Sequence, residues 1–188
     1  KDSDFVKLAH QLEDMGADSI CIKDMSGLLA PYAAYDLVTA LKSEIKIPID
    51  VHSHCTSGMG DMAILKSIEA GVDRIDTCLS PFAMSTSHTC TESIVDTLTG
   101  RDRDPHIDIN KLYPIAEHFK KVRKSLEEDF KLNTNLGIDP QVLSFQIPGG
   151  MLSNLRKQLT EQGVADKYED LLKEMPKVRA DLGYPPLV

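Results

Sequence analysis

The sequence predicts an α/β fold with a parallel sheet, because apolar runs of strand length alternate with helical segments over residues 1–80. An internal near-repeat supports this prediction. Residues 13–20 resemble residues 68–75, and each copy passes from a helix through a glycine into a short apolar run. Gly16 and Gly71 suit the left-handed conformation that ends many helices. The offset of 55 residues corresponds to about two βα units, so parallel strands with right-handed crossovers are expected.

The elements of this first part follow from periodicity. Apolar residues at helical spacing predict helices, and short apolar runs after turn residues predict strands. The predicted helices cover residues 3–15, 31–44 and 59–70, and the predicted strands cover residues 19–23, 47–54 and 74–79. Three βα-type strands are therefore expected, and no further strand of this type follows them.

The rest of the chain reads as mainly helical. A Ser/Thr-rich loop over residues 80–91 precedes a helix over 92–98, and a polar break over 100–108 precedes a long helix from Asn110 to about Leu132. Turn residues mark the next loop, namely Asn133, Asn135, Gly137 and Pro140. Two last helices are expected over residues 151–162 and 167–182, the second closed by Gly183, Pro185 and Pro186.

Composition and charge exclude several classes of protein. The 188 residues carry 29 Asp and Glu against 21 Lys and Arg, a net charge of -8. This is the wrong sign for a surface that neutralises phosphates, so no nucleic acid partner is expected. No stretch approaches the roughly 20 apolar residues of a membrane helix. The four cysteines are widely spaced without a C-x-x-C pair, which favours reduced thiols and a cytoplasmic location.

Two predicted strands end in residues that carry chemistry. Lys23 closes the apolar run 20–22, and the strand over residues 47–54 ends with His52 and His54. Functional groups of parallel α/β folds gather at the carboxyl ends of strands. Because strand side chains alternate, both imidazoles are expected on one side, within reach of one metal ion. The alternative is two histidines satisfied by hydrogen bonds or solvent.

Lys23 admits three interpretations. It could pair with Asp24 or Asp50, or extend its amine to the rim of the sheet. It could form a Schiff base, since a desolvated amine is a nucleophile. It could also capture carbon dioxide as a carbamate, which would be an oxygen ligand for a metal. The neighbouring His-x-His pair favours the carbamate.

Four phrases together resemble the biotin-dependent carboxyltransferases, a family that includes oxaloacetate decarboxylase α subunits, the central subunit of transcarboxylase and a subunit of pyruvate carboxylase. The phrases occupy residues 19–29, 52–59, 68–73 and 146–154, in the order that the family has them. The resemblance implies the late portion of a (β/α)8 TIM barrel followed by a C-terminal helical extension. The barrel segment is expected over residues 1–100, and the extension, packed on the barrel, over residues 101–188.

The resemblance also implies a site and a reaction. A divalent metal, most often zinc, would be held by His52, His54 and carbamylated Lys23. The reaction would be carboxyl transfer between biotin on a carrier domain and pyruvate or oxaloacetate. Expected partners are the biotin carboxyl carrier domain, a second copy in a homodimer and, in a sodium-pump complex, membrane decarboxylase subunits.

Two features of the family have no counterpart in these residues. An aspartate ligand precedes the part of the barrel seen here, and the proton-shuttling threonine follows the phrase that ends at Val188. No catalytic residue is therefore assigned within the chain, and no turnover of the isolated 188 residues is expected. Three strands leave two open sheet edges, so the isolated piece is expected to associate or rearrange.

Other interpretations stay open. One is a metal-dependent aldol-type lyase or synthase of the related barrel superfamily, which would not need Lys23. Another is a docking or dimerisation fragment without catalysis. The loop residues Ser85, Thr86, Ser87 and His88 follow the third strand on the functional face, where they could contact substrate or biotin or serve as turn and cap residues.

Overall fold

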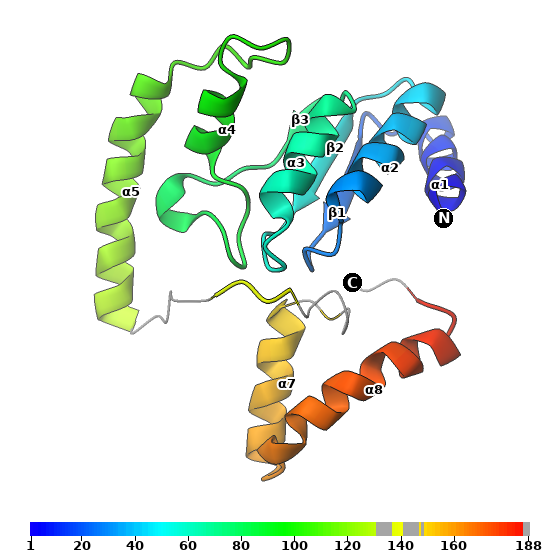
Figure 1. Cartoon of the computed structure of the whole chain (residues 1–188), viewed down its shortest axis with the longest axis vertical. Coiled ribbons are helices and arrows are strands. Elements are labelled where there is room, and N and C mark those ends of the chain that lie inside the picture. The colour runs from blue at the N-terminus through cyan, green and yellow to red at the C-terminus, as the bar shows by residue number, and fades with distance from the viewer. Residues whose placement is uncertain (131–136, 141–146, 148, 186–188) are drawn as a thin grey trace.

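The chain forms a three-stranded parallel sheet with helices packed against it (Figure 1). The computed structural model describes residues 1–130, 137–140, 147 and 149–185. The strand order is β1-β2-β3, as the alternation of helices and strands predicts. The sheet therefore grows by one strand with each βα unit, and the carboxyl ends of all three strands meet at one edge.

The register of the sheet places Lys23 beside His52. Strand β1 (Ile20–Asp24) pairs with β2 (Ile49–Ser53), and Lys23 lies opposite His52 in this ladder. Strand β3 (Arg74–Ile75) pairs with β2 through Asp50 and Val51. Side chains at paired positions of a parallel ladder point to the same face. The two predicted site residues therefore share one face of the sheet.

The third strand is shorter than the prediction of residues 74–79. Only two residues form a ladder with β2, and the Asp76 amide adds one further hydrogen bond to the Val51 carbonyl at 3.0 Å. Cys78 instead forms an isolated parallel bridge with Cys90. The chain leaves the sheet here because it turns into the 3-10 segment η1 (Ser80–Phe82).

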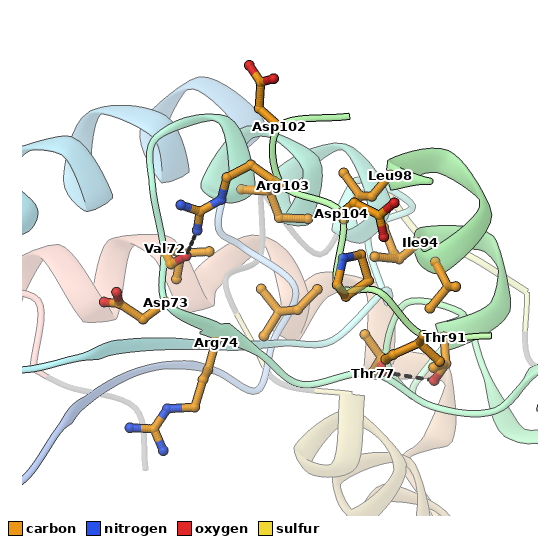
Figure 2. Close-up of a pocket in the computed structure, with 15 residues that line it drawn as sticks. Val72, Asp73, Arg74, Thr77, Thr91, Ile94, Leu98, Asp102, Arg103 and Asp104 are labelled. Carbon is orange, nitrogen blue, oxygen red and sulfur yellow. Dashed lines mark hydrogen bonds between the residues drawn. The ribbon is translucent and has the colours of Figure 1, made fainter. Parts of the chain in front are cut away.

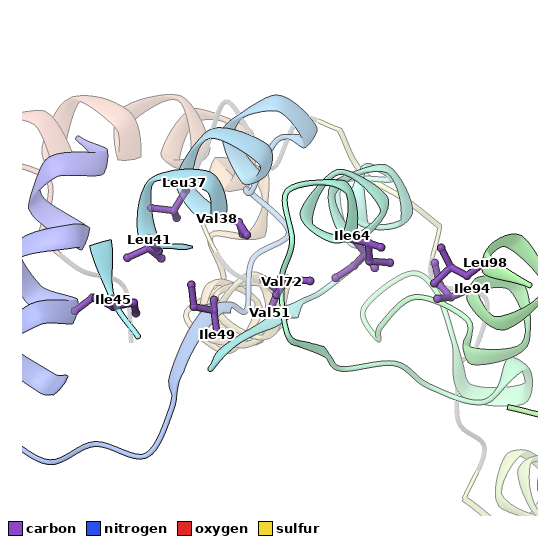
Figure 3. Packing of buried hydrophobic residues seen from close by; sticks show 12 residues of the cluster. Leu37, Val38, Leu41, Ile45, Ile49, Val51, Ile64, Val72, Ile94 and Leu98 are labelled. Carbon is purple, nitrogen blue, oxygen red and sulfur yellow. The ribbon is translucent and has the colours of Figure 1, made fainter. Parts of the chain in front are cut away.

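Three helices cover the opposite face of the sheet from the one that carries Lys23 and His52. They are α1 (Asp2–Asp14), α2 (Pro31–Glu44) and α3 (Gly60–Glu69). Ile49 and Val51 of β2 are fully buried and pack with apolar side chains of α2 and α3 (Figure 3). Alternation then places Asp50 and His52 of the same strand on the other face. The core thus fixes which side chains of β2 are available for chemistry.

The remaining helices are α4 (Thr91–Leu98), α5 (Ile109–Phe130), α7 (Gly149–Glu161) and α8 (Tyr168–Asp181). Helix α5 contacts α4 and η1, where Phe82 and Phe119 meet edge to face at 6.2 Å. The Arg123 guanidinium also donates a hydrogen bond to the Pro81 carbonyl. Helices α7 and α8 are joined through the 3-10 segment η2 (Ala165–Lys167) and diverge from it in Figure 1.

Most predicted elements are confirmed within one or two residues. The predicted helix end at Leu132, the turn residues Asn133 and Asn135, and parts of the phrase 146–150 lie outside the described residues. Among the described helices, none combines the length and the apolar composition that crossing a lipid bilayer requires.

Candidate metal centre

His52 and His54 meet at the carboxyl end of β2, as their spacing predicts. His52 is the fourth residue of the strand, and His54 follows its last residue. Their ring centroids lie 5.3 Å apart, and both side chains are partly exposed. The pair therefore occupies the edge of the sheet where parallel α/β proteins hold their functional groups.

A third histidine joins this pair from the loop after β3. The ring centroid of His88 lies 4.3 Å from that of His52 and 4.6 Å from that of His54. One ring nitrogen from each of the three lies within 4.8 Å of the others. Among the His, Cys, Asp and Glu side chains of the described residues, these three histidines form the one group close enough to share a metal ion. The sequence placed His88 on the functional face without assigning it as a ligand.

Each histidine has a hydrogen-bond acceptor at Nδ1. His52 Nδ1 lies 2.7 Å from a carboxylate oxygen of Asp76, and His54 Nδ1 lies 2.6 Å from the Thr86 carbonyl oxygen. His88 Nδ1 lies 2.9 Å from the Ser53 carbonyl oxygen. A carbonyl or carboxylate oxygen only accepts, so in the neutral form of each ring Nδ1 would donate and Nε2 would keep its lone pair. Acceptors of this kind orient histidine ligands in metal sites.

Burial lowers the pKa of His54. The neighbouring His88 and His52 lower it further, whereas the hydrogen bond to the Thr86 carbonyl and the charge of Asp24 act in the opposite direction. The net effect favours the neutral ring. Neutral imidazole is the form that binds a metal, because a protonated ring has no free lone pair.

Asp24 builds the turn after β1 and is therefore occupied by structural contacts. Its carboxylate accepts hydrogen bonds from the Leu28 and Leu29 amides at 3.0 and 2.9 Å and from the Ser53 hydroxyl at 2.9 Å. Its carbonyl also accepts a hydrogen bond from the His54 amide at 3.0 Å. These bonds tie the ends of β1 and β2 together, so the position of His54 depends on Asp24.

Gly27 lets the turn after β1 approach the backbone that follows His54. It has a φ of +67°, and a Cβ placed on it would lie 2.7 Å from the His54 carbonyl oxygen and 3.1 Å from the Thr56 amide nitrogen. Both the left-handed conformation and the close contact require glycine. Gly27 therefore helps to position the candidate metal centre, although it has no side chain that could take part in the chemistry.

The loop that carries His88 is held against the extension of β2. The Cys55 amide donates to the Ser87 carbonyl at 2.8 Å, and the Met84 amide donates to the His88 carbonyl at 2.7 Å. Met84 and Ser85 have φ values of 71° and 55°, which are uncommon for residues other than glycine. Strained backbone of this kind concentrates at functional loops and persists only when surrounding contacts fix it.

Lys23 points to the face of His52 but is exposed. The expected alternative, an ion pair with Asp24 or Asp50, is not formed. Asp24 binds the turn amides, and Asp50 lies 2.9 Å from Arg74 Nε. Within the described residues, the Lys23 amine therefore has no carboxylate partner that would explain it as a structural ion pair.

The sequence missed two groups that orient the histidines, Asp76 and Thr86. Asp76 directly follows β3 in the structure, just as His54 directly follows β2, but the sequence predicted a strand that continued to residue 79 and so gave no strand-end signal at Asp76. Thr86 acts through its backbone carbonyl, which any residue would supply. No feature of its side chain could have identified it.

A separate cavity of about 500 Å³ lies between α3, β3, α4 and the segment over residues 102–107 (Figure 2). Its walls are mainly apolar side chains, such as Ile94 and Leu98. The Arg103 guanidinium donates to the Val72 carbonyl, and Thr91 donates to Thr77 at 2.8 Å. None of the three histidines lines this cavity, so it is distinct from the candidate metal centre.

By its fold and site geometry, the chain is a parallel α/β protein with a cluster of histidines at the carboxyl edge of its sheet. Two family models match the chain, HMGL-like over residues 1–118 and Conserved carboxylase domain over residues 142–188. The chain belongs to the HMGL-like family, and its C-terminal part matches a domain model that is also found in carboxylases. This confirms the resemblance that the sequence motifs carry.

Curated relatives cover the chain almost completely. A pyruvate carboxylase subunit of Methanocaldococcus jannaschii is 56% identical over 184 residues, which are 98% of this chain and 32% of the relative. The methylmalonyl-CoA carboxyltransferase 5S subunit of Propionibacterium freudenreichii subsp. shermanii is 42% identical over 186 residues, 98% of this chain and 36% of the relative. The chain therefore spans about a third of the length of these relatives.

Solved structures share the fold. A variant of the carboxyl transferase domain from Rhizobium etli pyruvate carboxylase, determined with pyruvate, matches with a TM-score of 0.91 and 32% identity, covering 100% of this chain and 32% of that chain. The domain from the same enzyme with pyruvate and biocytin matches with a TM-score of 0.88 and 32% identity, covering 98% and 30%. These matches confirm the predicted portion of a TIM barrel with three parallel strands.

Proposed function

We propose that this chain is part of an enzyme that transfers a carboxyl group between biotin and pyruvate or oxaloacetate. The observation that carries the proposal is the histidine cluster at the carboxyl edge of the sheet, where barrel enzymes place their catalytic groups. The relatives support the substrate: one is named as a pyruvate carboxylase subunit, and a similar domain was determined with pyruvate and biocytin. Biotin would arrive on a carrier domain.

The donor set suits a divalent metal such as zinc. His52 and His54 offer imidazole Nε2 atoms, and the Nδ1 atoms of the same rings are held by Asp76 and Thr86. Lys23, on the same face of the sheet and without a carboxylate partner among the described residues, would supply an oxygen ligand as its carbamate. When bound, the metal acts as a Lewis acid that stabilises negative charge developing on the keto acid oxygen.

The chain's own residues preorganise this site. The hydrogen bonds of Asp24 and the close contact of Gly27 hold the turn after β1 against the backbone of His54. The core beneath β2 fixes the side of the strand that carries His52. Preorganised groups of this kind act without a reorganisation cost when charge develops.

The division of the chain follows from the same proposal. Residues 1–100 would be the barrel segment that carries the metal centre, and residues 101–188 the helical extension. The expected homodimer, the membrane decarboxylase subunits and the cytoplasmic location stay predictions.

The second candidate is an aldol-type lyase or synthase. The HMGL-like match over residues 1–118 favours it, since that match covers the whole metal centre. Two observations favour the carboxyltransferase. The carboxylase domain model matches residues 142–188, and Lys23 forms no ion pair with Asp24 or Asp50. Intact-mass measurement distinguishes the two, because a carbamate adds about 44 Da to Lys23 only in the carboxyltransferase. Native conditions with bicarbonate are needed, since carbamates are lost in acid.

The test uses the complete gene product, its metal content and its biotin-dependent decarboxylation of oxaloacetate. We expect about one divalent ion per chain and a rate that falls at least about 100-fold in His52→Ala, as the loss of a metal ligand implies. His118→Ala removes an exposed imidazole near the middle of α5, and this variant should retain the bound metal and the wild-type rate. A protein that lacks metal and is indifferent to His52→Ala would overturn the proposal.

A further inference from the structure

Two of the four cysteines lie side by side at the base of the loop over residues 79–89. Cys78 lies after β3, Cys90 is the N-cap residue of α4, and the two form an isolated parallel bridge. The Cys78 amide donates to the Thr89 carbonyl at 2.9 Å, and the Thr91 amide donates to the Cys78 carbonyl at 2.9 Å. This is the hydrogen-bond pattern of a parallel ladder in which the two cysteines are the paired residues.

Paired residues of a parallel ladder have the spacing that a disulfide needs. Neighbouring strands lie about 4.7–4.9 Å apart, and the side chains of a pair point to the same side. The Cα atoms of disulfide-bonded cysteines lie roughly 4.4–6.8 Å apart, so this pairing falls inside the allowed range. Cys78 and Cys90 are both free and partly exposed, so a small oxidant has access to them.

Contacts beside the pair hold the two segments together. The Thr91 hydroxyl donates to the Thr77 hydroxyl at 2.8 Å (Figure 2), on the side opposite to the thiols because side chains alternate along extended chain. The Glu92 carboxylate accepts the Ser80 amide with its two oxygens at 3.1 and 3.0 Å. The two backbones are therefore already fixed at a separation that is compatible with a disulfide.

The other two cysteines are placed where they do not compete for this pair. Cys55 is buried, and burial raises the pKa of its thiol to about 11, so little of the reactive thiolate forms at neutral pH. Its sulfur lies 3.8 Å from the Thr89 hydroxyl, on the other side of the extended segment from the Cys90 side chain. Cys21 lies on β1, and β2 separates it from β3 and the segment that follows.

We propose that Cys78 and Cys90 are a reversible dithiol–disulfide pair, which a small disulfide such as oxidised glutathione converts to the bonded form. One protein thiolate attacks a sulfur of the small disulfide, which forms a mixed disulfide and expels one small thiolate. The second protein thiolate then attacks the protein sulfur of the mixed disulfide and expels the other small thiolate. The two protein sulfurs are thus oxidised, the small disulfide is reduced, and the two protons of the protein thiols pass to the released small thiolates.

The bond would close a covalent ring over residues 78–90, and this ring contains the loop that orients the candidate metal centre. Within the ring, the Thr86 carbonyl lies 2.6 Å from His54 Nδ1. Oxidation would replace the hydrogen bond from the Cys90 thiol to the Glu92 carboxylate, at 3.4 Å, with the bond between the sulfurs. The redox state of the pair would therefore change the constraint on the loop against which His54 is held.

Trypsin provides a direct readout, because both cysteines fall in one tryptic peptide, residues 75–101. The complete gene product is incubated in its native state with an excess of oxidised glutathione, and the remaining free thiols are alkylated before digestion. In the bonded form this peptide should be about 2 Da lighter than its dithiol form and carry no alkyl group. Treatment with dithiothreitol before alkylation should restore a peptide with both cysteines alkylated.

Substitutions assign the bond to the pair. Cys78→Ser and Cys90→Ser should each abolish the lighter peptide. Cys21→Ser is the matched control and should keep it, because Cys21 is exposed and lies outside the pair. Hydrogen exchange of the amides over residues 79–89 should slow in the bonded wild type, because the ring limits opening of the loop. An unchanged exchange rate would overturn the effect on the loop.

The outcomes for the wild type decide the proposal without reference to the folding of any variant. A peptide 75–101 that stays fully alkylated in excess oxidant, or that carries glutathione on one cysteine without closing the ring, would overturn it. So would cross-linked peptides that join either cysteine to Cys21 or Cys55. These readouts need neither bound metal nor turnover, so their failure is distinguishable from a failure of the proposed carboxyl transfer.

Discussion

Gly27→Ala tests how the turn after β1 controls the proposed metal centre. Gly27 has a φ of +67°, and an added Cβ would lie 2.7 Å from the His54 carbonyl oxygen. That oxygen belongs to the backbone, so relief requires the chain at His54 or the turn itself to move. The substitution is therefore expected to destabilise the fold and to displace His54, a proposed metal ligand, at the same time.

The cost has two parts that a second glycine separates. Left-handed backbone costs an alanine roughly 1–2 kcal/mol, and an overpacked contact adds about 1–3 kcal/mol. Gly100 has a φ of +74° but no atom within 4 Å of the position where its Cβ would be. Gly100→Ala should therefore carry only the first cost, and Gly27→Ala both, a total of roughly 2–5 kcal/mol.

Urea unfolding followed by circular dichroism measures the free energy of unfolding of both variants beside the wild type. Chelator competition on the same samples measures zinc affinity, which should fall in Gly27→Ala and stay unchanged in Gly100→Ala. Equal destabilisation of the two variants, with equal zinc affinity, would show that the contact between Gly27 and the His54 backbone has no energetic consequence. The turn after β1 would then have no part in positioning the site.

Two further predictions concern carboxylates that accept backbone hydrogen bonds. Asp24→Asn replaces one of the accepting oxygens with a donor. It should destabilise the protein by roughly 2–4 kcal/mol, since hydrogen bonds to a charged acceptor contribute about 1.5–3 kcal/mol each. A decrease of under about 0.5 kcal/mol in the free energy of unfolding, measured in urea, would contradict this. Burial raises the pKa of Asp73, but the Lys42 ammonium and the Ile49 amide outweigh this and hold it below its usual value. A depressed pKa adds stability above about pH 4, and this stability is lost as the pH falls through the pKa of the folded state. Lys42→Gln should therefore lower the urea midpoint at pH 7 and have no such effect near pH 3. A difference in midpoint between variant and wild type that stays constant across that range would refute the linkage.

The sheet could be predicted because its determinants are local. Alternating apolar runs and glycines such as Gly16 and Gly71 mark each βα unit without reference to other parts of the chain. The length of β3 could not be predicted this way. Residues 76–79 have strand-like character, but a ladder also needs a partner, and Cys78 finds its partner in Cys90 instead of in β2. Strand length is thus set by pairing, which periodicity does not report.

The same distinction between local and distant determinants applies to the site. His52 and His54 are two residues apart, and the alternation of a strand brings their rings to one face. Lys23 is 29 residues away from His52, yet it could be placed because parallel strands end at a common edge. Regular structure therefore carries a prediction across the sheet, as long as both residues belong to strands.

His88 lies beyond that rule because a loop without regular structure positions it. Its place depends on two left-handed residues and on hydrogen bonds from the Cys55 amide and to the Ser53 carbonyl, which no periodic pattern encodes. Met84 and Ser85 are not residues that favour positive φ, so the sequence indicated an ordinary turn there. The contacts that hold this loop meet the carboxyl end of β2, and they fix a backbone conformation that by itself costs free energy. The position of His88 is therefore set by tertiary contacts between the loop and β2, which no local sequence pattern reports.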